Sequence, residues 1–242
     1  MTTLPAGTVT FVFSDIEGST QLLKRLGDRY AAVIDGHRSI MRETFGEHGG
    51  VEIDTQGDSF FFAFGRARDA VAAAVAAQRR HADHGWPDEA TVRVRMGLHT
   101  GEPAIGSEGY LGVDVVRAAR LAASGRGGNV LLSETTRALL GGSLPDGVSV
   151  HALGERRLKD IDEPERIYEL DIAGLEQPSP LDPGGEAAGD AGAGVADEAV
   201  AEAQMDRRTA DFSRRLRARI NENVLESLER SLGDIGKKRG RR

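Results

Sequence analysis

The chain has 242 residues, a formal net charge of -7 and no cysteine. The absence of cysteine excludes disulfide bonds and thiolate metal sites, and it fits a reducing cytoplasm, which is the location we expect. The negative charge argues against nucleic-acid binding by the body of the protein. No stretch approaches the roughly 20 apolar residues of a membrane helix.

The first strong pattern is a strand followed by a polar turn and a helix. The apolar run Val9–Phe13 predicts a buried strand, which leads into Asp15. One amphipathic helix over about Leu22–Ile34 is expected next, with Ser19 or Thr20 as its cap. A carboxylate beside the free N–H groups of a helix start suits a metal-bound polyphosphate. A plain strand, turn and helix, with the aspartate as a cap, explains this stretch equally well.

A second carboxylate lies in a predicted hairpin, Val51–Phe64. Two apolar strands flank Thr55–Asp58, and Gly57 suits the turn between them. If this hairpin lies beside the first strand, Asp15 and Asp58 become neighbours, and two adjacent carboxylates repel unless a cation lies between them. A pair of Mg2+ or Mn2+ ions held by aspartates and phosphate oxygens is the usual reason for such an arrangement.

The remaining elements follow in an order that indicates the fold. The expected helices are Arg66–His84, Val113–Ala123 and Glu134–Leu140, the last capped by Ser133. The expected strands are Thr91–His99, Asn129–Leu132, Val148–Leu153 and Glu165–Asp171, and a loop is expected over Thr100–Gly109. The order β-α-β-β-α-β, with further strands at the end, predicts an α+β fold with a ferredoxin-like core.

Composition divides the chain into three segments. We expect a catalytic domain over residues 1–172, a flexible linker rich in Pro, Gly, Ala and acidic residues over 173–204, and a C-terminal segment over 205–242. Apolar residues recur every four positions in Met205–Ile235, which predicts an amphipathic helix, and a basic tail follows. That helix could pair with its twin, dock on a protein partner, lie on an anionic membrane or pack back onto the domain.

Five segments resemble the class III nucleotidyl (adenylyl and guanylyl) cyclase catalytic domain of the bacterial type. They are FSDIEGST, TQGDSFFFAF, RMGLHTGEP, GYLGVDVVRAARLAASGRGGNVLLS and LGERRLKDIDEPERIYEL. The resemblance covers about Thr8–Asp171, and it implies a ferredoxin-like βαββαβ core with additional C-terminal strands. The predicted order of elements therefore agrees with the resemblance. A metal-binding ferredoxin-like module of another lineage would require all five matches to be coincidental.

The resemblance implies an enzyme that converts a nucleoside triphosphate, ATP or GTP, into a 3′,5′-cyclic nucleotide and pyrophosphate, in cyclic-nucleotide signalling. Such cyclases are head-to-tail homodimers with their sites at the interface. Asp15, the carbonyl of Ile16 and Asp58 would hold two divalent metal ions, Mg2+ or Mn2+. The amides of Gly18 and Ser19 would contact the phosphates.

The partner protomer would supply two cationic side chains. Arg120 stands at the family's transition-state arginine, whose fork stabilises negative charge on the α-phosphate. Lys159 stands at the phosphate-binding lysine. The alternatives are an arginine on an exposed helix face and a solvated lysine in a charged loop.

Three positions depart from the family's pattern. Asp54 stands where adenylyl cyclases carry a base-reading lysine, Gly109 where they carry an aspartate, and Val116 where they carry a ribose-positioning asparagine. An ionised Asp54 only accepts hydrogen bonds, and guanine presents two adjacent N–H groups, so we expect GTP to serve at least as well as ATP. A shifted hairpin, or an ion pair with Arg93 or Arg95, would remove Asp54 from the base. Val116 favours the alternative of a catalytically weak domain that binds nucleotide or a regulatory protein partner.

Overall fold

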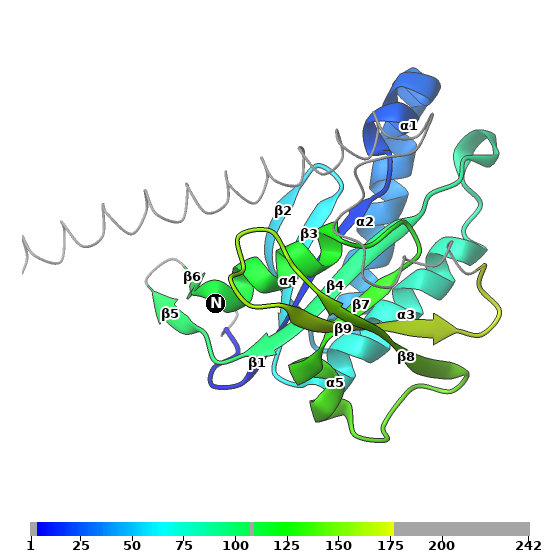
Figure 1. Ribbon diagram of the computed structural model, residues 1–242. Helices are drawn as coiled ribbons and strands as arrows, with labels where there is room; N and C mark the ends of the chain where they lie inside the picture. Colours follow the sequence, from blue (N-terminus) through cyan, green and yellow to red (C-terminus); the bar gives the residue numbers. More distant parts are fainter. Residues whose placement is uncertain (1–3, 107–108, 177–242) are drawn as a thin grey trace, which may run out of the picture.

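The computed structural model describes residues 4–106 and 109–176 (Figure 1). Within this part of the chain, a seven-stranded sheet has the strand order β2-β3-β1-β4-β7-β9-β8, and β5 and β6 form a separate two-stranded sheet. The predicted helix over Met205–Ile235 and nearly all of the predicted linker lie outside the described residues. The three-segment division therefore stays a prediction.

The strands and helices have the following bounds. The strands are β1 Val9–Ile16, β2 Val51–Gln56, β3 Ser59–Phe64, β4 Val94–Gly101, β5 Ala104–Gly106, β6 Gly109–Leu111, β7 Val130–Ser133, β8 Val148–Arg156 and β9 Glu165–Ile172. The α-helices are α1 Ser19–Leu26, α2 Tyr30–Glu47, α3 Ala67–Asp83, α4 Val113–Ala123 and α5 Glu134–Leu140. Short 3-10 turns occur at Gly27–Arg29 and Pro87–Glu89.

The topology confirms the predicted α+β fold with a ferredoxin-like core. The first four long strands lie in the order β2-β3-β1-β4, and each pairs antiparallel with its neighbours. One crossover runs through α1 and α2, and the other runs through α3. β7 then adds parallel to β4, and the antiparallel strands β9 and β8 extend the sheet. These are the additional C-terminal strands that the sequence predicted.

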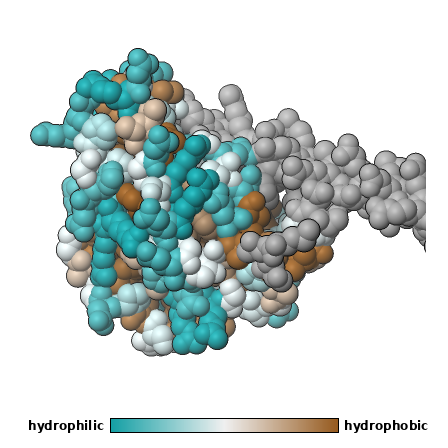
Figure 2. Space-filling model, turned by 180° about the vertical axis from the view of Figure 1, so that it is seen from behind, coloured by the Kyte–Doolittle hydropathy of each residue, from teal (hydrophilic) through white to brown (hydrophobic). Residues whose placement is uncertain are grey.

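The two faces of the sheet are covered by different helices (Figure 1). Side chains alternate along β1, so Val12 packs in one buried cluster with residues of α2 and α3. Phe11 packs in another buried cluster with Ala118 and its neighbours on α4. The surface seen from behind is mostly hydrophilic (Figure 2). Among the described residues, none of the helices has the length and hydropathy that a membrane span requires.

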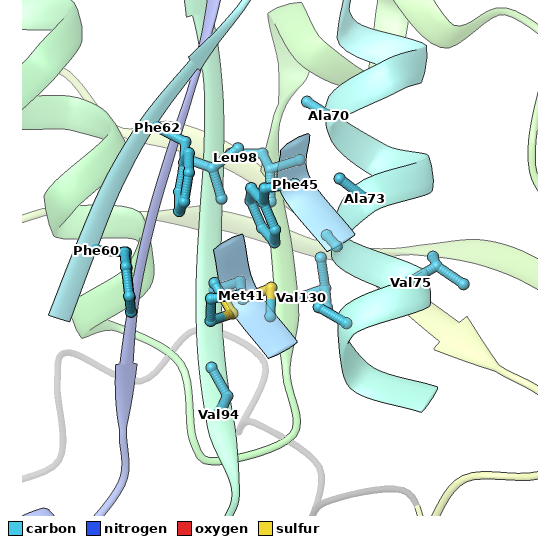
Figure 3. Close-up of a cluster of buried hydrophobic side chains, with 14 of the residues drawn as sticks. Met41, Phe45, Phe60, Phe62, Ala70, Ala73, Val75, Val94, Leu98 and Val130 are labelled. Carbon is cyan, nitrogen blue, oxygen red and sulfur yellow. The ribbon is translucent and has the colours of Figure 1, made fainter. Parts of the chain in front are cut away.

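The larger core cluster packs α2 against its neighbour α3 and against the sheet. Figure 3 shows Met41 and Phe45 of α2 beside Phe62 of β3, with Ala70 and Ala73 of α3 opposite. The rings of Phe45 and Phe62 have centroids 4.5 Å apart. Both alanines are fully buried, and their small side chains leave room for the aromatic rings. This packing sets the position of α2 against the turn between β2 and β3.

Helix boundaries near the first strand differ from the prediction. The sequence predicted one helix, whereas the structure has α1 and α2 with a 3-10 turn, Gly27–Arg29, between them. The N-cap of α1 is Gly18, with φ of 64° and no side-chain hydrogen bond. The prediction that Ser19 or Thr20 caps this helix was therefore wrong.

Two later segments give one confirmation and one correction. Ser133 is the N-cap of α5, and its side chain accepts a hydrogen bond from the N–H of Thr136, as predicted. The loop predicted over Thr100–Gly109 was wrong in part, because β5 lies inside it and pairs with β6. A three-residue strand is too short to show a clear alternation of apolar residues.

Helix α4 packs unusually close to β4 because the strand carries a glycine there. A Cβ atom at Gly97 would lie 2.1 Å from the backbone nitrogen of Ala122 and 2.8 Å from the carbonyl oxygen of Ala118. The backbone of α4 therefore rests directly on β4. Any side chain at position 97 would push the helix away from the sheet.

We predict that Gly97→Ala lowers the free energy of unfolding by about 1–3 kcal/mol, because the added methyl group overpacks this contact. Chemical denaturation of both proteins measures the difference. Gly142→Ala is the matched control, because a Cβ atom there would meet no atom within 4 Å. Equal losses in the two variants would contradict the close contact.

Candidate active site

Two carboxylates lie side by side at the end of β1. β1 pairs antiparallel with β3 from Thr10 to Ser14, so the turn that precedes β3 meets the last residues of β1. The backbone N–H of Ile16 donates to Oδ2 of Asp58 at 3.0 Å. Asp15 is 4% exposed and Asp58 is 2% exposed. Both carboxylates are therefore withdrawn from solvent, where an unneutralised pair is costly.

A buried arginine that the sequence analysis did not assign to the site neutralises one of them. Arg95 on β4 donates from Nε to Oδ1 of Asp15 at 2.6 Å and from Nη2 to Oδ2 at 3.0 Å. Burial disfavours its charge, but the carboxylates of Asp15, Glu17 and Asp58 outweigh this effect and raise the pKa of Arg95. Arg95 also donates from Nη1 to the carbonyl of Ala123 at 3.3 Å. The guanidinium thus links β1, β4 and the end of α4.

The donor set at this edge of the sheet fits a hard divalent cation. The N–H of Glu17 donates to the carbonyl of Arg93, the residue before β4, at 2.9 Å. The carbonyl of Ile16, in the same peptide group, therefore points the opposite way, toward Asp58. Two carboxylates and one carbonyl are oxygen ligands of the kind that Mg2+ and Mn2+ prefer. Among the described residues, no three His, Asp or Glu side chains gather to hold a metal. Phosphate oxygens or water would have to supply the remaining ligands.

The start of α1 lies directly beyond these carboxylates. Its first turn contains no acidic residue, and its N-cap, Gly18, makes no side-chain hydrogen bond. The carbonyl of Gly18 accepts from the N–H groups of Gln21 and Leu22 at 2.9 and 3.0 Å. Ser19 is buried, with 7% exposure. An uncapped helix start of this kind favours a bound anion such as phosphate.

Arg120 is paired, within one protomer, with the residue that follows Lys159 in the chain. The guanidinium of Arg120 on α4 forms an ion pair with Asp160, which lies in the connection between β8 and β9. Lys159 is the neighbour of Asp160 in this connection and is exposed. The side chain of Arg120 is only 11% exposed, so the alternative of an arginine on an exposed helix face was wrong.

Comparison with known proteins identifies the family. The model of the adenylate and guanylate cyclase catalytic domain matches residues 1–170. The chain belongs to this family. An adenylate cyclase from Trypanosoma brucei, solved in its monomeric state, has a TM-score of 0.66 at 26% identity, covering 73% of this chain and 95% of that one. Both findings confirm the resemblance seen in the sequence.

Curated relatives are longer than this cyclase chain. An uncharacterized protein of Mycobacterium tuberculosis is 38% identical over 168 residues, which are 69% of this chain and 56% of that protein. An adenylate cyclase of Lachancea kluyveri is 32% identical over 154 residues, covering 53% of this chain and 8% of that enzyme. The chain thus spans about half the length of the first relatives it matches.

Asp54, where adenylyl cyclases carry the base-reading lysine, lies on β2 at an irregularity of the hairpin. The register between β2 and β3 shifts between Glu52 and Asp54. Asp54 accepts a hydrogen bond from Nε2 of Gln56 at 3.3 Å. Neither arginine that was considered as its partner binds it in the described part of the chain, because Arg93 pairs with Glu176 and Arg95 pairs with Asp15. That structural alternative was wrong.

The two remaining departures from the cyclase pattern have different surroundings. Val116 packs against a buried cluster that contains Leu158 and Ile161, from the segment that also carries Lys159. An apolar contact therefore replaces the hydrogen-bonding group that the family uses here. Gly109 begins β6 with φ of 129°, and a Cβ atom there would meet no atom within 4 Å.

Sequence reasoning also missed a buried histidine pair behind the carboxylates. Nδ1 of His37 on α2 lies 2.9 Å from Nε2 of His81 on α3, and Nε2 of His37 lies 2.9 Å from the carbonyl oxygen of Asp58. Burial lowers the pKa of His37 to about 4 and that of His81 to about 3. Both histidines fall on apolar helix faces, so periodicity alone shows that they are buried and says nothing about their partners.

We predict that Arg95→Met lowers the free energy of unfolding by about 3–5 kcal/mol, because it leaves the carboxylate of Asp15 buried without its partner. Urea denaturation measures this loss. Arg93→Met is the control on the same chain segment, since its ion pair with Glu176 is exposed and is worth about 0–1 kcal/mol. A small loss for Arg95→Met would show that the buried pair contributes little.

Proposed function

We propose that this chain is a metal-dependent nucleotidyl cyclase that converts ATP or GTP into a 3′,5′-cyclic nucleotide and pyrophosphate. The observation that carries the proposal is the placement of Asp15 and Asp58. Two buried carboxylates, one at the end of β1 and one in the turn that precedes β3, lie near an uncapped helix start, in a chain of the cyclase family. Protein carboxylates at such a position hold the cations that accompany a triphosphate.

The residues of this chain have distinct roles in the proposed reaction. Asp15, the carbonyl of Ile16 and Asp58 would hold two Mg2+ or Mn2+ ions. When bound, such ions would supply activation of the ribose 3′-hydroxyl and positive charge opposite the triphosphate. The amides of Gly18 and Ser19 would donate to phosphate oxygens. The 3′-hydroxyl would lose its proton to water, and its oxygen would form a bond to the α-phosphorus. The bond between the α-phosphorus and the bridging oxygen would break, so that pyrophosphate leaves. The protein contributes mainly positioning and charge, as is usual for phosphoryl transfer.

Two cationic side chains would complete this site from a second protomer. Arg120 would stabilise the charge that grows on the α-phosphate, and Lys159 would bind the outgoing phosphates. The ion pair between Arg120 and Asp160 supports a common role, because it attaches the chain segment that carries Lys159 to α4. Two exposed apolar residues, Ile105 on β5 and Val113 at the start of α4, support a homodimer interface.

The alternative function is a nucleotide-binding or regulatory domain with little turnover. Val116 favours it, because a valine cannot form the hydrogen bond that would orient the ribose. Contacts of the C-terminal segment with a protein or an anionic membrane remain predictions from the sequence. Incubation with each nucleoside triphosphate and Mn2+ or Mg2+, followed by mass detection of cyclic products, separates the two functions.

We predict that Asp15→Asn and Asp58→Asn each lower the rate of cyclic nucleotide formation by at least about 100-fold. A bound metal ion supplies several kcal/mol of charge stabilisation, and each change removes one anionic ligand. Asparagine keeps an acceptor for Arg95 or for the N–H of Ile16, but Asp15→Asn leaves the buried Arg95 without its anionic partner. Rates are therefore compared at a temperature where thermal unfolding shows that each variant is folded. Asp83→Asn, an exposed position at the end of α3, is the control. Full turnover in both test variants would exclude the metal mechanism.

We predict that mixing Asp15→Asn protein with Arg120→Ala protein restores activity, although each variant alone is inactive. A heterodimer of these chains contains one interface site with an intact aspartate and an intact arginine. Product formation after subunit exchange is the measurement, and mass spectrometry of the mixed dimer confirms the exchange. Mixed dimers without activity would place both residues in a site built within one chain.

We predict that the wild-type chain uses GTP at least as well as ATP. A hydrogen bond to a charged partner is worth about 1.5–3 kcal/mol, so Asp54→Ala should lower kcat/KM for GTP by about 10- to 150-fold and leave the value for ATP nearly unchanged. Parallel initial rates with both nucleotides measure this. A strong preference for ATP that Asp54→Ala does not alter would remove Asp54 from base recognition.

A further inference from the structure

Two side chains of helix α2 contact the backbone of the turn that carries Asp58. Arg38 donates from Nε and Nη2 to the carbonyl oxygen of Gly57 at 3.1 and 2.8 Å. His37, the preceding residue of the helix, contacts the carbonyl oxygen of Asp58 with Nε2 at 2.9 Å. Two consecutive side chains thus hold two consecutive carbonyls. Gly57 has φ of 61°, so the turn exposes both oxygens to the helix.

The imidazole of His37 is in turn positioned by a contact with His81 on helix α3. A carbonyl oxygen only accepts, so Nε2 of His37 donates to Asp58 and the other ring nitrogen, Nδ1, is an acceptor. Nε2 of His81 donates to this Nδ1 across the 2.9 Å contact between the rings. His81 is further fixed by Trp86, whose Nε1 donates to its carbonyl at 3.0 Å. A chain of contacts therefore runs from α3 through α2 to the backbone of Asp58.

The backbone of Asp58 is thus set by α2, while its side chain is set by β1 through the N–H of Ile16. His37 is fully buried, and a buried imidazole costs more than an apolar side chain of the same volume. Its ring lies 5.5 Å from that of Phe60, and its polar contacts are with His81 and with the carbonyl of Asp58. What the histidine adds is a fixed position for the carbonyl of Asp58.

We propose that His37 and Arg38 are positioning residues for the metal site, because they fix the orientation of Asp58 through the carbonyls of Gly57 and Asp58. The inference rests on the proposed function, since it takes Asp58 as a ligand of the divalent ion. Outer groups that orient a metal ligand typically change metal affinity by about 10- to 100-fold. Loss of either donor removes neither carboxylate. It leaves the turn that carries Asp58 less firmly held, so the orientation of the Asp58 carboxylate varies more.

Direct binding of Mn2+ tests this inference without relying on turnover. Free Mn2+ is measured by electron paramagnetic resonance in the presence of 3′-deoxy-GTP or 3′-deoxy-ATP, which lack the attacking hydroxyl. We expect Arg38→Met and His37→Leu to raise the dissociation constant for Mn2+ by about 10- to 100-fold. His37→Gln keeps an N–H donor near the position of Nε2, and we expect it to bind Mn2+ close to the wild-type value.

Arg42→Met is the matched control for this experiment. Arg42 lies one turn further along α2 and pairs with Glu52 on β2, so it holds the same hairpin away from the turn. We expect its Mn2+ affinity to equal that of the wild type. Thermal unfolding of every variant verifies that the fold is retained. If His37→Leu does not fold, the Mn2+ affinity of Arg38→Met alone tests the positioning role.

The outcomes separate the inference from the function on which it rests. Wild-type Mn2+ affinity in folded Arg38→Met and His37→Leu would overturn the positioning role. An equal loss in Arg42→Met would do the same, because it would show a general loosening of the hairpin. A wild-type chain that binds no Mn2+ would overturn the metal site and the inference together. A chain that binds Mn2+ but yields no cyclic product would overturn the proposed function and leave the positioning role supported.

Discussion

The buried ion pair between Arg95 and Asp15 is the constraint on which the site depends. Withdrawing a carboxylate from water costs several kcal/mol unless a partner with good geometry offsets it. Arg95 meets both oxygens of Asp15 and also reaches the carbonyls of Ala123 and Gly125 at the end of α4. One guanidinium therefore ties together two strands and a helix end. The position of Asp15 is set by this network before any ligand binds.

The same region depends on a close approach of helix and sheet. Gly97 lets the backbone of α4 rest on β4, and the end of α4 can then receive the guanidinium of Arg95. One turn earlier, the same helix carries Arg120, whose partner Asp160 fixes the connection between β8 and β9. A short helix thus joins the carboxylate end of the sheet to the cationic group proposed to act on a second protomer. The close packing of α4 on β4 thus sets where both Arg95 and Arg120 lie.

The opposite face of the sheet supports the second carboxylate. α2 is fixed by aromatic packing against β3 and by the alanines of α3 (Figure 3). From that position it reaches the turn between β2 and β3 with His37 and Arg38. Asp15 is therefore held from the α4 side, and Asp58 is held from the α2 side. The departures at Asp54 and Val116 leave both supports intact, because neither residue takes part in them.

Local patterns in the sequence predicted most of the helices and strands, and they also indicated the family. The bounds of α4 and α5, the Ser133 cap and the hairpin around Gly57 follow from periodicity and turn chemistry over a few residues. The contacts that organise the site join residues far apart in the chain, such as Arg95 with Asp15 and His37 with His81 and Asp58. Their pairing depends on strand register and on how closely helices approach the sheet, and a short window of sequence contains neither. The sequence therefore determined which carboxylates are available, and only the tertiary structure decided what neutralises and positions them.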